Sequence, residues 1–163
     1  LKITRKWYTT DGTEFTGDTL AEGDVLVAAI TVESSNAIND GLVVDLLPGG
    51  LEVENLNLTD ASQWEGVEIE GVSLGDRSGA ADIKHEEYRD DRYVAALSMY
   101  AGATAHLFYI VRAVSPGTFV VPPASIEDMY RPELRAYSVA KPERVKVVPP
   151  QAKATSSDEE REG

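Results

Sequence analysis

The sequence contains no cysteine, only two histidines and two methionines, and no long uninterrupted run of apolar residues. The absence of cysteine excludes disulfides, thiolate nucleophiles and Cys-ligated zinc. The absence of an 18-residue apolar stretch argues against a membrane-spanning helix. The chain also begins at Leu1 without a methionine or a signal peptide, so we expect it to be a piece of a longer polypeptide.

Basic residues are scarce compared with acidic ones. The 163 residues include 15 Lys and Arg against 28 Asp and Glu, a net charge of −13. The imbalance is concentrated in residues 1–70, which carry 14 acidic and 3 basic groups. A surface this acidic repels phosphate backbones and anionic headgroups, so neither nucleic acid nor a membrane surface is expected as a direct partner.

Helical periodicity is also missing, apart from a short turn at 59–64 for which Thr59 or Asp60 would be the N-cap. Short β-branched runs separated by Gly and Pro predict strands instead. The run 24–33 is apolar on both faces, which is typical of a central strand. Seven or more such strands predict an all-β fold, an antiparallel β-sandwich. The clearest strands are expected at 24–33, 42–47, 51–54, 93–99, 105–114 and 118–121.

Turn residues predict how several of these strands connect. Pro48-Gly49-Gly50 forms a tight corner between 42–47 and 51–54. The linker Tyr-Ala-Gly-Ala at 100–103 suits an antiparallel hairpin between 93–99 and 105–114.

We expect one sandwich domain over residues 1–148 and a disordered acidic tail over 149–163. The tail has no large apolar side chain and begins with Pro-Pro, a composition that cannot offset the entropy of ordering. Residues 65–82 contain four glycines and are predicted to form a long loop, a kind of segment that often carries interactions.

No pattern for catalysis or cofactor binding is present. His85 and His106 belong to no HExxH or i, i+4 pair, so a metal site is not expected. GxSxG, GxGxxG and P-loop motifs are absent. The acidic pairs at 86–87 and 90–91 are adjacent on strands and therefore point to opposite faces, unlike a glycosidase dyad. We expect a protein that is not an enzyme and needs no cofactor.

The most unusual segment is EDMYRPE at 127–133, which follows the strand-ending Pro122-Pro123. Met129 and Tyr130 stand side by side between charged residues, so this domain's own core does not require both of them. The residue types alone favour a place at the edge of the core over a role in docking.

Three segments in order carry a resemblance to a known family: VVDLLPGGLEVEN at 43–55, HEEYRDDRYVAAL at 85–97, and FYIVRAVSPGTFVVPPASIEDMYRPELRA at 108–136. Together they resemble the C-terminal macroglobulin-like domain of bacterial alpha-2-macroglobulins, over most of residues 1–148. The resemblance implies a macroglobulin or immunoglobulin-like sandwich, the last module of a large periplasmic protein often tethered to the inner membrane as a lipoprotein. In such inhibitors a protease cuts a bait region, the inhibitor changes shape and the protease is trapped.

The resemblance also implies a role for Met129 and Tyr130. In thioester-bearing relatives the terminal domain packs over a reactive Cys–Gln thioester in a separate upstream domain, and a Met-Tyr pair shields it from water. The resemblance therefore favours a docking role for Met129 and Tyr130 over a place at the edge of this domain's core. The implied partners are the other domains of the same chain, above all the thioester domain, and target proteases through the parent protein.

Two alternatives remain open. The first is a structural or adhesin-like immunoglobulin-type module of the cell envelope that binds another protein through the loop 65–82. The second is a glycan-binding sandwich, which predicts a row of exposed aromatic side chains, whereas Trp7 and Trp64 are isolated in the sequence.

Overall fold

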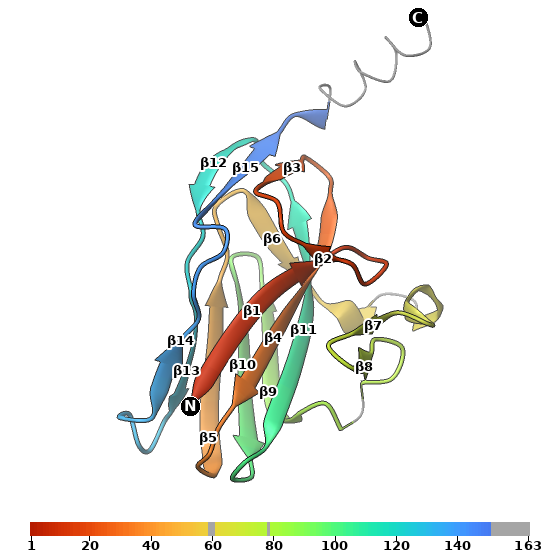
Figure 1. The fold of residues 1–163 in the computed structure, drawn as a ribbon. Helices are drawn as coiled ribbons and strands as arrows, with labels where there is room; N and C mark the ends of the chain where they lie inside the picture. Colours follow the sequence, from red (N-terminus) through yellow and green to blue (C-terminus); the bar gives the residue numbers. More distant parts are fainter. Residues whose placement is uncertain (59–60, 78, 151–163) are drawn as a thin grey trace, which may run out of the picture.

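Two large sheets face each other in a computed structural model that describes residues 1–58, 61–77 and 79–150 (Figure 1). Every strand pairing within these two sheets is antiparallel. The prediction of an all-β antiparallel sandwich is therefore confirmed. The first sheet has the order β2 (Glu14–Phe15), β1 (Lys2–Tyr8), β4 (Val25–Glu33), β11 (Thr104–Ala113) and β6 (Leu51–Glu54). The second has the order β14 (Arg135–Tyr137), β13 (Ala124–Asp128), β5 (Ile38–Leu46), β10 (Arg92–Met99) and β9 (Asp82–Arg89).

Two small sheets complete the described part of the chain. One closes an end of the sandwich with β12 (Gly117–Val120), β15 (Arg144–Val148) and β3 (Thr19–Ala21), in which β15 pairs with β3 in parallel. The other is a short hairpin of β7 (Glu68–Ile69) and β8 (Val72–Ser73). Two 3-10 turns, Leu56–Leu58 and Ala61–Trp64, precede the hairpin. No described helix is long and apolar enough to cross a membrane.

Strand β4 is central, as its sequence predicts, because it pairs with β1 on one side and β11 on the other. Its inward side chains, such as Ile30, join the main core between the sheets. Its outward side chains Val27 and Ala29 join a second apolar cluster, which also contains Trp64 and Ile69. Both faces of β4 are therefore covered, and the second cover is the segment that contains the β7–β8 hairpin.

The segment 65–82, predicted as a loop, is thus partly structured. It contains β7 and β8, joined by a tight turn in which Glu70 and Gly71 have φ angles of 53° and 81°. Ile69 and Leu74 are buried against the outer face of the first sheet. A strand of two residues is too short to show an alternation of apolar and polar side chains. The four glycines of the segment therefore led to the prediction of a loop.

The predicted hairpin between 93–99 and 105–114 is wrong. β10 pairs with β5 and β9, whereas β11 pairs with β4 and β6, so the link at 100–103 crosses from one sheet to the other. Across the core, Tyr93 of β10 stacks on Tyr109 of β11 with ring centroids 4.9 Å apart. The same turn residues serve a hairpin and a crossing, and only the partner strands distinguish the two.

Three further expectations concern the chain's ends and the short turn. The 3-10 turn Ala61–Trp64 lies where the turn at 59–64 is predicted, but its proposed caps Thr59 and Asp60 lie outside the described residues. β15 ends at Val148, the predicted domain boundary. Residues 151–163 lie outside the described part, so the disordered tail stays a prediction.

Candidate functional site

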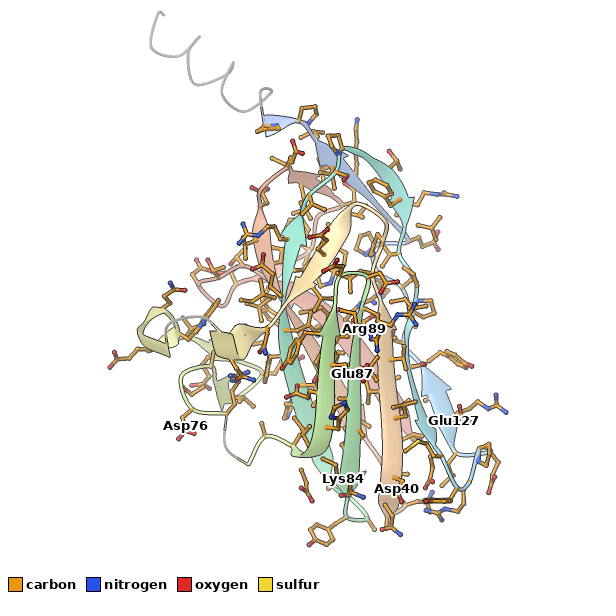
Figure 2. All side chains as sticks on the ribbon, turned by 180° about the vertical axis from the view of Figure 1, so that it is seen from behind. Asp40, Asp76, Lys84, Glu87, Arg89 and Glu127 are labelled. Atoms are coloured by element: carbon orange, nitrogen blue, oxygen red, sulfur yellow. The ribbon has the colours of Figure 1, made fainter. Side chains whose placement is uncertain are left out.

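Three connections meet at one end of the sandwich: 34–37 between β4 and β5, 100–103 between β10 and β11, and 129–134 between β13 and β14. The amide of Gly102 donates to the carbonyl of Ser34 over 2.8 Å, and the amide of Met129 donates to the carbonyl of Asp40 over 2.9 Å. We name the surface formed by these three connections the tyrosine end. It is the lower end in Figure 1 and carries the labelled Asp40 and Lys84 in Figure 2.

The tyrosine end exposes large apolar side chains that the domain's own core does not use. Met129 is 49% exposed, Tyr130 is 80% exposed and Tyr100 is 87% exposed. Neither Met129 nor Tyr130 belongs to either apolar cluster. The interpretation of this pair as an edge of the core is therefore wrong, because both side chains are exposed and neither packs in an apolar cluster.

A buried carboxylate holds the backbone from which the pair projects. Asp128 is 2% exposed, and its Oδ1 accepts hydrogen bonds from the amides of Tyr130 at 3.0 Å and Arg131 at 3.3 Å. Its Oδ2 accepts from the Arg131 guanidinium, with Nη2 at 3.2 Å. The same Nη2 donates to the carbonyl of Ala37 over 2.5 Å. The two charged residues that flank Met129 and Tyr130 therefore clamp the loop to the neighbouring connection.

Burial of Asp128 by itself would raise the pKa of its carboxyl group, because the charged form loses hydration. The hydrogen bonds from the amides of Tyr130 and Arg131 and from the Arg131 guanidinium outweigh that effect. The pKa of Asp128 is consequently lowered below its ordinary value of 3.8. The clamp therefore contains a carboxylate at neutral pH, which makes each of its hydrogen bonds charge-assisted.

The loop is also closed on itself through its backbone. The amide of Asp128 donates to the carbonyl of Leu134 over 3.0 Å, and the amide of Leu134 donates to the carbonyl of Arg131 over 2.9 Å. A loop tied at both ends holds its exposed side chains in a defined position, so less entropy is lost when they dock. This geometry suits contact with another protein surface.

A hollow of about 600 Å³ adjoins the tyrosine end. Its lining includes Ala37, Asn39, Met99, Tyr100 and the polar residues Asp82 and Ser98. Lys84 Nζ donates to the carbonyl of Asn39 and lies 3.1 Å from Asp40 Oδ1, and Figure 2 shows Lys84 and Asp40 side by side. The hollow therefore offers apolar and polar groups to a protruding side chain, and Ser98 Oγ in its lining lies 3.3 Å from Asp82 Oδ2.

The two histidines lie elsewhere. His85 is exposed on the edge strand β9, with Nε2 3.3 Å from Glu87 Oε1. His106 on β11 lies 3.3 Å from the hydroxyl of Thr31 and 3.9 Å from Glu70 Oε2. In the described part of the chain, no group of three or more His, Asp or Glu side chains is placed to hold a metal ion.

The neighbouring carboxylates of β9 point in different directions, as strand alternation requires. Glu86 Oε2 accepts hydrogen bonds from the hydroxyls of Tyr88 at 2.9 Å and Tyr93 at 2.5 Å. Glu87 instead contacts Arg89, with Nε 3.0 Å from Oε2, and Figure 2 shows both on the exposed side of β9. The two carboxylates do not form a dyad.

Three residues of the tyrosine end are absent from the sequence-based prediction: Tyr100, Asp128 and Arg131. A usable signal existed for the last two, since an Asp and an Arg three residues apart enclose the Met-Tyr pair. Tyr100 gave no signal, because only the fold brings 100–103 beside 34–37.

Comparison with known proteins gives a consistent result. The family model "Bacterial Alpha-2-macroglobulin MG10 domain" matches residues 1–133. The alpha-2-macroglobulin of Xylella fastidiosa (strain 9a5c) is 51% identical over 150 residues, covering 92% of this chain and 9% of the relative. The chain thus spans about a tenth of the length of the curated relatives it matches.

Solved structures agree. The native conformation of Escherichia coli alpha-2-macroglobulin matches with a TM-score of 0.80 and 39% identity, covering 91% of this chain and 9% of that one. The trypsin-activated form of the same protein gives a TM-score of 0.77 and 39% identity, over 91% of this chain and 10% of that one. Salmonella alpha-2-macroglobulin reacted with methylamine gives a TM-score of 0.77 and 35% identity, over 91% and 9% of the two chains.

Proposed function

The chain belongs to the bacterial alpha-2-macroglobulin MG10 domain family, and from this premise we propose that it is the noncatalytic C-terminal module of a protease-trapping inhibitor. Its partners are then the other domains of one long polypeptide and, through that polypeptide, target proteases. The trypsin-activated form in which the E. coli relative was solved supports a response to proteolysis. The proposed location is the periplasm, with attachment to the inner membrane through a lipid anchor of the parent protein.

Within that protein, we propose that Met129 and Tyr130 cover the thioester region of a neighbouring domain. The observation that carries this proposal is their exposure on a loop that Asp128 and Arg131 hold in place. The Salmonella relative was solved after reaction with methylamine, and primary amines open thioesters. A thioester survives in water only where water is excluded, and a thioether beside an aromatic ring excludes water without adding a strong nucleophile.

Thiol release from the full-length parent protein tests this proposal. Methylamine is added, and the liberated thiol is followed with a chromogenic disulfide for the unmodified protein and for the Met129→Ala and Tyr130→Ala variants. Removing either cover should speed release, with Tyr130→Ala having the larger effect because the ring covers more area. Val120→Ala is the matched control, since Val120 is 65% exposed on β12 at the opposite end of the sandwich.

The outcomes separate the parts of the proposal. Faster release in both variants with an unchanged rate in Val120→Ala supports shielding by this domain. Equal rates in all four proteins would overturn the shielding role. An absence of thiol in every form, even after denaturation in amine, would mean that the parent traps proteases without a thioester.

A further inference from the structure

The first sheet has an open edge along most of β1. β2 covers only Trp7 and Tyr8 of this strand, whereas β4 pairs with it along its whole length. Within the part of the chain that the structure describes, residues 2–6 of β1 therefore have no hydrogen-bonded strand on their outer side. Unpaired strand edges are the usual sites at which a protein adds a strand from a partner.

Backbone alternation identifies the free groups on this edge. The amide of Thr9 donates to Thr13 on the β2 side, over 2.7 Å. In an antiparallel pair, residues of the same parity direct their amide and carbonyl to the same side, so those of Ile3 and Arg5 point to the open edge. Among the described residues, the backbone groups of Ile3 and Arg5 have no partner on that side. Two amides and two carbonyls are thus available to an added strand.

A groove runs beside these free groups. It has a volume of about 580 Å³ and lies between β1 and the segment that follows β14. Its apolar walls are Phe15, Tyr137 and Val139, of which Tyr137 is 63% and Val139 is 73% exposed. An inserted strand would therefore have an apolar surface on which to bury alternate side chains.

The charge of the groove is opposite to that of the chain. All three basic residues of the acidic segment 1–70 lie on β1. Arg5 turns inward to the buried Asp45, whereas Lys2 and Lys6 are exposed on the outer face of the strand. Lys141 lines the far wall, and the groove's carboxylate, Glu14, makes only a long 3.9 Å contact with Lys6.

We propose that this groove binds an extended segment of a partner protein in which acidic and apolar residues alternate. The segment pairs with Ile3 and Arg5 through its backbone. Its acidic side chains then lie beside Lys2, Thr4 and Lys6, because opposed residues of paired strands share a face. Its apolar side chains face the groove. A second copy of this chain does not fit, because pairing two β1 edges would bring their lysines together.

A synthetic peptide tests the proposal on the 163-residue chain. The probe is a capped seven-residue peptide of alternating glutamate and valine, titrated into the isotopically labelled chain and followed by two-dimensional NMR. The largest shifts are expected at the amides of Ile3 and Arg5. A peptide in which lysine replaces glutamate should bind about tenfold more weakly, because the charge match is reversed.

Backbone methylation separates strand pairing from simple charge attraction. The valines oppose Ile3 and Arg5, so their amides face β1, whereas the glutamate amides face away. N-methylation of the valines should weaken binding about tenfold through the lost hydrogen bonds, while N-methylation of the glutamates should leave it nearly unchanged. Equal effects of the two methylated peptides would overturn the proposal.

Variants locate the contact. Replacing Lys2 and Lys6 with Gln should weaken binding about fivefold, because two exposed charge pairs are lost. The matched control replaces Arg144 and Lys146, which are exposed on β15, with Gln and should bind like the unmodified chain. Equal loss in both variants would mean nonspecific attraction and would contradict the proposal.

Tighter binding by a chain ending at Pro150 would mean that residues 151–163 compete for the groove, and would overturn the assignment to a separate partner.

Discussion

Two buried aspartates, each beside an arginine, have different surroundings in this domain. Asp45 lies in the middle of β5, is fully buried, and contacts Arg5 of β1 and the hydroxyl of Tyr109 on β11. Asp128 lies at the end of β13, where it holds the loop that carries Met129 and Tyr130. The first links the two sheets through the core, and the second fixes a surface loop.

Their pKa values move in opposite directions. Burial raises the pKa of Asp45 above 3.8, although Arg5 and the Tyr109 hydroxyl both act to lower it. For Asp128 the hydrogen bonds outweigh burial, and its pKa is lowered. The comparison teaches that the same pair of residue types stabilises the fold in one place and positions exposed side chains in another.

The largest effect is expected from Asp45→Ala. The substitution leaves the buried Arg5 guanidinium without its counter-ion and the Tyr109 hydroxyl without its acceptor. Breaking a buried pair in this way costs about 3–5 kcal/mol. Urea denaturation of the variant and the unmodified chain measures this loss as a difference in the free energy of unfolding.

A double variant provides the control for that prediction. Arg5→Met together with Asp45→Leu removes both charges and keeps apolar volume in the core, so it should be markedly more stable than Asp45→Ala. A double variant as unstable as the single one would mean that the pair itself, and not the unpaired charge, stabilises the sandwich.

Asp128→Ala should destabilise the fold less than Asp45→Ala, but it should loosen the loop that carries Met129 and Tyr130. The loss of the bonds to the amides of Tyr130 and Arg131 should cost about 1–2 kcal/mol. Amide hydrogen exchange should quicken in residues 129–134 and stay unchanged in β4. Unchanged exchange in that loop would contradict the clamp.

The dependence of stability on pH should differ in sign between the two aspartates. The pKa of Asp128 is lowered on folding, so its contribution is complete above 3.8 and is lost as the pH falls through the folded value. The pKa of Asp45 is raised, so its contribution is complete below 3.8 and falls as the pH rises through the folded value. Urea denaturation gives the free energy of unfolding of Asp128→Asn, Asp45→Asn and the unmodified chain from neutral pH to about 2.5. The difference between each variant and the unmodified chain should change with pH in opposite directions for the two aspartates.

Tyr130→Ala should have the smallest effect on the stability of the 163-residue chain. The ring is 80% exposed and belongs to no core cluster, so the change in unfolding free energy should be within about 0.5 kcal/mol. Thermal and urea denaturation check this value. A loss of about 3 kcal/mol would place the ring in the core instead.

Local patterns predicted the strands better than their partners. The apolar run at 24–33 indicated a central strand, and β4 confirms it because clusters on both of its faces need apolar residues. The pairing of 93–99 with 105–114 was wrong because a four-residue link does not reveal whether it stays in one sheet. Asp45 was not recognised as a buried charge, because its partners Arg5 and Tyr109 are 40 and 64 residues away in sequence.

The candidate site was predictable only through the family resemblance. Residue types alone placed Met129 and Tyr130 at the edge of the core, whereas the resemblance implied an outward-facing pair. The family is confirmed, and the pair's shielding role stays a proposal. The loop that carries the pair is held by Asp128 and Arg131. Arg131 also bonds to the carbonyl of Ala37, which lies 94 residues away in the sequence, so local patterns could not reveal this contact.

Methionine oxidation tests most directly whether the Met-Tyr pair is covered in the full-length parent protein. Of the chain's two methionines, Met129 is 49% exposed and Met99 is 6% exposed, so Met99 serves as an internal reference. Dilute peroxide followed by mass spectrometry should oxidise Met129 much faster than Met99 in the 163-residue chain. In the native parent protein, Met129 should be protected to nearly the level of Met99, and reaction with methylamine should restore its oxidation. Equally fast oxidation of Met129 in the 163-residue chain and in the native parent protein would contradict the proposed docking.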